Sequence, residues 1–433
     1  MGRPASGVRG LWSAIAVLIA LALASSTTAC AVEPADADAD ADPNGSSEAA
    51  ATETTFAAAD PAATSATKTV LANLHSFDMG SSNAFDRRIL IGQQEADVSN
   101  RRTSGLTRLT SDVQNLTGKT AAVVGYELSH VDKGALTMFD AAAFRAGAPA
   151  LRARILEQHA RGALVTLVWH LRCPKTANNV PDTFGGSDCP RDYRLEELLE
   201  RKNDGSRGAH FVAWRAMLDE LSELLWSLKD ARGQLVPVQI RPFHEFTGDW
   251  FWWGHANPPA IYGAVWREMV TYIREGRGLH NALWVFCPAS PSDTGSFTSF
   301  YPGDAYVDVV AFDRYDFGNG RFASGYETDL RTVGTFARVH HKVAAVGEVG
   351  TDLGRRGNAD PTWFTRTMLA PLKASGRSFA YVTVWRNAPW EKFVPEPGDG
   401  PIAEDFRAMA QDGAALLGGQ HDLYTPLHVP SSS

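Results

Sequence analysis

The chain has 433 residues, 44% of them hydrophobic, and a formal net charge of −8 at pH 7. Length and composition are those of an ordinary globular protein with a large core. A net negative chain with a pI near 5.9 makes nucleic acid an unsuitable partner. Twelve tryptophans are more than core packing alone accounts for.

Residues 1–30 predict an export signal rather than part of the fold. Arg3 and Arg9 precede an apolar run at residues 11–24, which is too short for a comfortable membrane span. Small residues then lead to Cys30, an order that resembles a bacterial lipoprotein signal. Thr27 departs from that pattern, because leucine usually stands there. We therefore expect a cell-surface lipoprotein lipidated at Cys30, with ordinary secretion as the alternative.

Residues 31–66 are rich in Ala, Asp, Ser and Thr and contain almost no large apolar side chain. Such a segment cannot bury enough surface to fold, so it predicts a flexible acidic tether. A folded domain should follow at residues 67–417. The polar and proline-containing end, residues 418–433, is expected to be a loose tail.

Eight short apolar runs alternate with helical patterns across the folded region. Runs that are apolar on both faces are typical of parallel strands covered by helices. Eight such alternations in one region predict a single (β/α)8 TIM barrel. The predicted strands are residues 89–94, 121–128, 163–170, 237–245, 282–288, 307–315, 343–350 and 379–387.

Export permits disulfides, and two cysteines bracket a loop rich in Asn, Pro, Gly and Asp. Cys173 and Cys189 are therefore a possible disulfide pair. Cys287 ends a predicted strand and is expected to be a buried free thiol. No cysteine–histidine spacing suggests a zinc site, and no glycine-rich phosphate loop is present, so we expect no cofactor and no metal.

The fourth predicted strand opens into the stretch Arg241-Pro-Phe-His-Glu-Phe-Thr-Gly-Asp-Trp-Phe-Trp-Trp-Gly254. A carboxyl group among aromatic rings is poorly solvated, so the pKa of Glu245 should rise. A glutamic acid in that state can donate a proton near neutral pH. Aromatic faces suit flat sugar rings, so the stretch predicts a glycosidase with Glu245 as general acid/base.

A second glutamate stands at the end of the seventh predicted strand, in Gly347-Glu-Val-Gly350. The carboxyl ends of the strands hold the active site in such barrels. Glu348 is therefore the candidate nucleophile, although a lone strand-end glutamate is more often paired with an arginine. Retaining glycosidases place their two carboxyls about 5–5.5 Å apart, and inverting ones about 6.5–9.5 Å. The sequence leaves that distance open.

Other polar and aromatic residues end the same strands. A nucleophile needs hydrogen-bond donors that aim it, and Tyr315, His244 and Arg241 are the candidates. For Arg241, a purely structural role in a buried ion pair is an equally good interpretation. His170 could hydrogen-bond a sugar hydroxyl, and Trp250 and Trp385 could form the surface on which a sugar ring stacks. Asp249, Asp313 and Asp316 are expected to support the site rather than to react.

Together these motifs resemble glycoside hydrolase family 26, whose best-known members are endo-β-1,4-mannanases. The resemblance covers about residues 70 to 415, and the Arg241–Gly254 stretch is its most specific part. The motifs that carry it, besides that stretch, are Ile91-Gly-Gln-Gln94, Val168-Trp-His170, Phe312-Asp-Arg-Tyr-Asp316, Gly347-Glu-Val-Gly350 and Val384-Trp-Arg-Asn387.

The resemblance implies a (β/α)8 barrel and a retaining reaction with Glu245 as acid/base and Glu348 as nucleophile. It also implies that His244 positions the nucleophile and Tyr315 hydrogen-bonds it. His170, Trp250 and Trp385 would line the subsite of the sugar under attack. A departure is Glu127, since relatives usually have aspartate there, and the longer side chain would alter the edge of the pocket.

The expected partner is a β-mannan polysaccharide or oligosaccharide, cleaved by a monomer. Same-family alternatives are a β-1,3-xylanase, a mixed-linkage β-glucanase and an exo-mannobiohydrolase. A barrel hydrolase acting on aryl or cell-wall glycosides is a further alternative. From another class, the chain could be a non-catalytic carbohydrate-binding lipoprotein, but both glutamates and their supporting groups are present.

Overall fold

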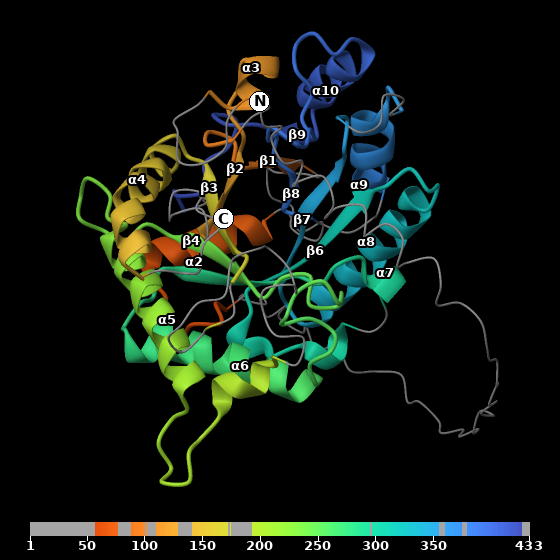
Figure 1. Cartoon of the computed structure of the whole chain (residues 1–433). Helices are drawn as coiled ribbons and strands as arrows, with labels where there is room; N and C mark the ends of the chain where they lie inside the picture. The colour runs from red at the N-terminus through yellow and green to blue at the C-terminus, as the bar shows by residue number, and fades with distance from the viewer. Residues whose placement is uncertain are drawn as a thin grey trace, which may run out of the picture. The chain divides into compact units, whose positions relative to one another are not determined.

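Eight parallel strands close into a barrel in the computed structural model of the chain (Figure 1). Strands β2 to β8 pair in chain order, and β1 pairs with both β2 and β8. A short β9 adds to β1. The strands are β1 (Ile89–Gln94), β2 (Val123–Glu127), β3 (Leu164–Trp169), β4 (Val238–Pro242), β5 (Ala282–Phe286), β6 (Val309–Asp316), β7 (Val343–Thr351), β8 (Tyr381–Val384) and β9 (Ala415–Leu416).

The described part of the chain has several gaps. It comprises residues 57–76, 88–99, 102, 110–128, 141–171, 174, 193–294, 297–354, 360–374 and 379–426, with residues 141–143 described by their backbone alone. The predicted signal segment with Cys30, and the predicted Cys173–Cys189 pair, lie outside these residues and stay predictions. Within them, no helix is long and apolar enough to cross a membrane.

Helices follow the strands and lie around them (Figure 1). The α-helices are α2 (Ser65–His75), α3 (Asp112–Thr117), α4 (Ala141–Ala160), α5 (Ala209–Ser227), α6 (Pro259–Thr271), α7 (Pro291–Thr294), α8 (Phe322–Val339), α9 (Ala370–Ala374) and α10 (Pro401–Gln411). The 3-10 turns are η2 (Leu195–Leu199), η4 (Thr298–Phe300) and η5 (Asp304–Tyr306), and the π-helical turns are η3 (Tyr272–Gly276) and η6 (Trp363–Leu369).

The strands bury both faces, as the apolar runs predict. One set of alternating side chains, such as Val310 and Phe312 of β6, packs in the layer beneath the helices. The other set, such as Val309 and Ala311, fills the barrel interior. The sequence prediction of a (β/α)8 barrel is therefore confirmed.

Helix α2 covers the amino-terminal end of the barrel interior, where Val70, Leu71 and Leu74 join the interior cluster. The predicted flexible tether is wrong for its last ten residues, 57–66. The backbone N–H of Ala59 donates to the carboxylate of Asp308 at 2.8 Å, and Asp60 is buried against His280. These residues are ordered because the groups that they hydrogen-bond, Asp308 and His280, lie at the end of the barrel.

The end of the chain is also better ordered than its composition predicts. Leu423 is fully buried in the interior cluster, and its carbonyl accepts a hydrogen bond from the Asn73 side chain at 2.9 Å. The Tyr424 hydroxyl donates to the carbonyl of Ala163 at 2.8 Å. The loose-tail prediction is therefore wrong for residues 418–426, because two large side chains fix them to the barrel.

Candidate active site

Glu348 owes its place in the barrel mouth to an irregularity in β7. Val343 and Ala345 face the interior and Ala344 and Val346 the outer layer, so simple alternation would turn Glu348 outward. The register with β6 shifts here, since Val346 pairs with Phe312 but Glu348 pairs with Asp313. Such bulges re-aim side chains beside active sites. The bulge brings the Glu348 carboxylate to Arg241.

The bulged residue, Gly347, has no room for a side chain. A Cβ there would lie 2.6 Å from an Asp313 carboxylate oxygen and 2.9 Å from the Cys287 sulfur. Both distances are shorter than real Cβ contacts. Glycine is therefore required so that β6 and β5 can place Asp313 and Cys287 beneath Glu348.

The carboxylate of Glu348 is held from two sides. Arg241, at the end of β4, donates to one of its oxygens, and the Tyr315 hydroxyl donates to the other at 2.6 Å. Arg241 also donates to Asp313 at 2.6 Å, and all three ion-paired side chains are buried. These donors fix the direction of the carboxylate and supply its counter-charge.

Glu245 lies three residues beyond β4 rather than on its predicted end. Strand β4 stops at Pro242 because Phe243 and Glu245 take left-handed backbone angles, with φ of 45° and 53°. The turn is anchored where the N–H of Glu245 donates to the carbonyl of Cys287 at 2.7 Å. Strained backbone of this kind persists only where its surroundings hold it, and it gathers at functional sites.

The surroundings of Glu245 favour its neutral form. Burial, followed by the nearby charge of Glu348, raises the pKa of Glu245 to about 7. The indole N–H of Trp250 donates to the Glu245 carboxylate at 2.7 Å and partly offsets the rise. The rise in pKa that the sequence predicts is therefore present, with burial and the charge of Glu348 as its causes, and it leaves a proton available near neutral pH.

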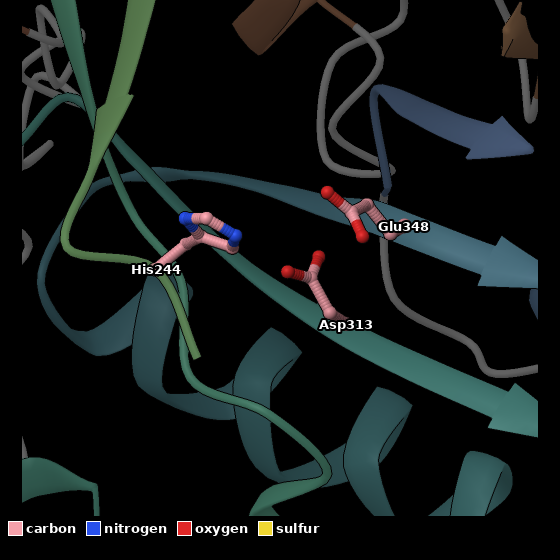
Figure 2. Close-up of side chains that lie close together, drawn as sticks. All are labelled: His244, Asp313 and Glu348. Carbon is pink, nitrogen blue, oxygen red and sulfur yellow. The ribbon is translucent and has the colours of Figure 1, made fainter. Parts of the chain in front are cut away.

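His244 faces the two buried carboxylates. Figure 2 shows its imidazole turned toward Asp313 and Glu348. One ligand atom of each residue lies within 4.8 Å of the others. Burial, then the charge on His170, lowers the pKa of His244 well below its usual value, so the ring is neutral. Among the described residues no hydrogen bond joins the ring to Glu348, so the positioning role of His244 stays a prediction.

These three residues also have the composition of a metal site. Here, however, the Arg241 guanidinium contacts both carboxylates. A fixed cation therefore already neutralises the acidic pair, and a metal ion would have to displace it. The donor set fits the arginine better than a metal.

His170 follows β3 and packs edge-on against the His244 ring. The two ring centroids are 4.5 Å apart, and Phe251 and Trp385 are the next rings at 5.3 and 6.5 Å. Glu127 at the end of β2 binds both the His170 backbone and its Nδ1. His170, Trp250 and Trp385 therefore share the mouth with Glu245 and Glu348, as the sequence predicts.

The floor of the mouth around Trp385 is fixed by an ion-pair network. The Trp385 indole and Arg386 both donate to Glu391, at 3.2 and 2.8 Å. Arg386 also donates to Glu95, after β1, at 2.6 Å. Glu95 follows β1 and Arg386 follows β8, and these two strands are neighbours. The network therefore connects the Trp385 ring to the ends of two adjacent strands.

Several residues that lie in the barrel mouth are not among the site residues that the sequence predicts. Phe251 stacks on Trp253 at 4.4 Å, and Trp253 is core, its N–H donating to the His244 carbonyl at 2.8 Å. Cys287 is a buried free thiol, as predicted. Glu391 and Glu95 lie in loops without a motif, and only the unusual left-handed backbone of Glu95, φ 49°, marks it.

Comparison with known proteins agrees with this geometry. Residues 59–355 match the sequence profile of Glycosyl hydrolase family 26, the family that the sequence motifs resemble. A mannan endo-1,4-beta-mannosidase of Bifidobacterium adolescentis is 28% identical over 351 residues, 77% of this chain. Only 33% of that relative is covered, so the chain spans about a third of its length.

Solved structures give the same result at the level of the fold. A modular endo-beta-1,4-mannanase from Cellulomonas fimi is 29% identical with a TM-score of 0.72, covering 86% of this chain and 80% of that one. A GH26 beta-mannanase from Bacteroides ovatus is 27% identical with a TM-score of 0.69, covering 84% of this chain and 99% of that one.

Proposed function

Because the chain belongs to glycoside hydrolase family 26, we propose that it cleaves β-1,4-mannosidic bonds within mannan chains by a retaining double displacement. The observation that carries the proposal is the contrast between two carboxyls in one mouth. Glu245 is held where its neutral form is favoured. Glu348 is held by a cation and a hydroxyl. A retaining glycosidase needs this division of roles.

In the first step, Glu245 gives its proton to the oxygen of the scissile glycosidic bond. The Glu348 carboxylate attacks the anomeric carbon as the carbon–oxygen bond breaks, and a glycosyl ester forms. Arg241 and Tyr315 hold the attacking carboxylate in position, so little motion is needed on the way to the transition state. The leaving sugar departs with the proton from Glu245.

In the second step, water attacks the anomeric carbon of the ester. Glu245, now a carboxylate, takes a proton from that water, and Glu348 leaves as a carboxylate. Both residues return to their starting protonation states. The configuration at the anomeric carbon is retained because two inversions have occurred.

The sugar under attack would occupy the space between His170, Trp250 and Trp385. Aromatic faces bind the C–H side of a pyranose, and the imidazole is suited to a ring hydroxyl. Neutral His244 lies within 4.8 Å of Glu348, so it would shape the pocket without adding charge. The network of Arg386 keeps Trp385 in place.

Mannan is favoured over other β-glycans by the relatives, since the Bifidobacterium protein is a mannan endo-1,4-beta-mannosidase. A fungal relative with the same name, from Thermothelomyces thermophilus, is 28% identical over 296 residues. The word endo in these names supports internal cleavage. A β-1,3-xylanase, a mixed-linkage glucanase and an exo-acting enzyme are the outcomes that would replace the proposal.

The deciding experiment is the product profile on linear mannan, galactomannan, mixed-linkage β-glucan and β-1,3-xylan. Wild type is compared with Glu245→Ala and Glu348→Ala. Glu268→Ala serves as a control, because that glutamate pairs with Arg215 on the outer helices. Manno-oligosaccharides of several lengths are expected from wild type and control only, with losses of about 10²–10⁴-fold in kcat for Glu245→Ala.

Each other result has a definite reading. A single disaccharide product would mean an exo enzyme, and release only from glucan or xylan would overturn the substrate. Binding without cleavage by the wild type would mean a carbohydrate-binding protein. Unchanged cleavage by Glu348→Ala would remove Glu348 from the mechanism.

A further inference from the structure

Glu127 holds His170 by both of its carboxylate oxygens. One oxygen accepts the His170 backbone N–H at 3.0 Å, and the other binds Nδ1 of the ring. The Glu127 side chain is only 2% exposed, and that of His170 is 17% exposed. Because Nδ1 is bound to Glu127, Nε2 is the ring nitrogen that can contact a sugar.

The His170 ring lies between Glu127 and the reacting groups. On one side it meets the carboxylate at the end of β2. On the other it packs edge-on against His244 and Phe251. The carboxyls of both Glu245 and Glu348 act on its charge. A charge placed on His170 is therefore felt by the acid/base and by the nucleophile.

Burial alone would lower the pKa of His170, but Glu127, Glu348 and Glu245 together outweigh burial, and the pKa is raised. When His170 carries a proton, its charge acts back on the acid/base, because the charge of His170 lowers the pKa of Glu245. The pKa of about 7 for Glu245 thus already includes this opposing contribution.

We propose that Glu127 is a positioning residue that keeps His170 as an imidazolium with Nε2 toward the sugar, and that this charge sets the upper pH limit of the reaction. The inference rests on the proposed function of the same site. The ionisable groups that face Glu245 and His170 across the mouth are Glu127 from β2, Arg241 and His244 from β4 and its turn, Asp313 and Tyr315 from β6, and Glu348 from β7.

The direction in which the pH profile moves distinguishes an effect of Glu127 through His170 from a direct effect of Glu127 on Glu245. Loss of the negative charge of Glu127, acting straight on Glu245, would lower the pKa of Glu245. Loss of the imidazolium, acting through His170, would raise it. The charge of His170 lowers the pKa of Glu245, and we expect this indirect effect to prevail.

The test is the pH dependence of kcat/KM for Glu127→Gln, which keeps the shape of the side chain and removes its charge. The alkaline limb should move upward by about one pH unit. At the wild-type optimum, kcat/KM should fall about tenfold, because the ring is less well aimed. Glu220→Gln is the matched control, since Glu220 is a buried carboxylate paired with Arg145 on the outer helices, and its profile should equal that of wild type.

Two further variants keep the test decisive even if Glu127→Gln folds poorly. Glu127→Asp retains the charge with a shorter reach, so it should lower kcat/KM and leave the alkaline limb in place. His170→Gln removes the imidazolium directly and should move the limb upward as Glu127→Gln does. In the His170→Gln background, Glu127→Gln should give no further upward shift.

A limb that stays in place, or moves to lower pH, in Glu127→Gln and His170→Gln would overturn the proposal. NMR of labelled histidine gives an independent reading, because the His170 titration should move to lower pH in Glu127→Gln and not in Glu220→Gln. The profiles are measured on whichever polysaccharide the wild type cleaves, so a wrong substrate assignment leaves this test intact. Failure of the wild type on every glycan would instead overturn the proposed function.

Discussion

At the scale of single residues, the site depends on how two glutamates of one mouth are paired. Glu348 has a guanidinium and a phenol hydroxyl on its oxygens. Glu245 has one indole N–H and a carboxylate neighbour. Two carboxyls in opposite environments differ in how readily they hold a proton, which suits Glu245 to the proposed role of acid.

Glu245 should make the protein less stable as the pH rises. Its folded pKa, about 7, lies above its ordinary value of 4.5, so the unfolded chain loses the proton first. The associated stability is complete below pH 4.5 and is lost as pH rises through about 7. Relative to wild type, Glu245→Gln should therefore gain about 2 kcal/mol in unfolding free energy between pH 5.5 and 8.5.

Urea unfolding at the two pH values checks this prediction. The wild-type curve serves as the reference at each pH, so other titrating groups largely cancel. The same difference between variant and wild type at both values would show that Glu245 is not held neutral. The variant should be inactive at both, a trade of activity against stability that is common in active sites.

Arg241 should matter for folding as well as for the reaction. Arg241→Met would leave the buried carboxylates of Asp313 and Glu348 side by side without a counter-charge, which costs about 3–5 kcal/mol. Arg277→Met is the control, because that arginine pairs with Glu223 and Asp219 near the surface and should change stability by less than about 1 kcal/mol. Equal losses in the two variants would mean that Arg241 is not the essential counter-charge.

At the scale of elements, the bulge of β7 decides which way Glu348 points. Gly347→Ala should push against Asp313 and Cys287, whose atoms lie 2.6 and 2.9 Å from the new Cβ. We expect kcat to fall about 10²-fold because Glu348 and Arg241 shift together. Gly413→Ala meets nothing within 4 Å and should keep full activity. Wild-type kinetics for Gly347→Ala would show that the bulge tolerates a side chain.

Most elements could be predicted from the sequence because the strands are apolar on both faces and the helices carry an apolar stripe along one face. Strand β1 was predicted to the residue, residues 89–94. The end of β4 was not, because nothing in the residue types of Phe243 and Glu245 signals left-handed backbone. Glu220 of α5 is charged but buried beside Arg145, and only the contact with α4 explains its burial.

In the candidate site, too, residues that stand in sequence motifs could be predicted, whereas contacts between distant residues could not. Glu245 and Glu348 stand in recognisable stretches, so their presence in one mouth could be predicted. The direction of Glu348 depends on a register shift against β6, which pairing alone reveals. The hold of Glu127 on His170 joins residues 43 positions apart, and no local pattern encodes such a contact.

At the scale of the whole barrel, the two ends of the described chain meet beneath the interior. Asn73 of α2 donates to the carbonyls of Leu423 and Thr425, at 2.9 Å each. Residues that composition assigns to a loose tail are therefore fixed to the barrel. The packing at this end of the barrel is separated along the barrel axis from the proposed reacting residues, which lie at the carboxyl ends of the strands.

Leu423→Ala should test that separation. Leu423 is fully buried, so its truncation should cost about 2–5 kcal/mol of unfolding free energy and lower the Tm. At 25 °C, kcat should stay at the wild-type value. Val212→Ala, at a side chain 60% exposed, should change stability by less than about 0.5 kcal/mol. A large drop in kcat for Leu423→Ala would show that the two ends of the barrel are coupled.

The charge of Glu348 beside Glu245 also sets the order of proton transfers. That charge raises the pKa of Glu245, and it exists only while Glu348 is free. Once Glu348 becomes an ester in the proposed first step, the repulsion disappears and the pKa of Glu245 falls. The acid that has just given its proton away thus becomes a stable base when water arrives. When the ester is cleaved, Glu245 takes its proton from the attacking water, and the returning charge of Glu348 raises the pKa of Glu245 again, so that the proton stays until the next cycle.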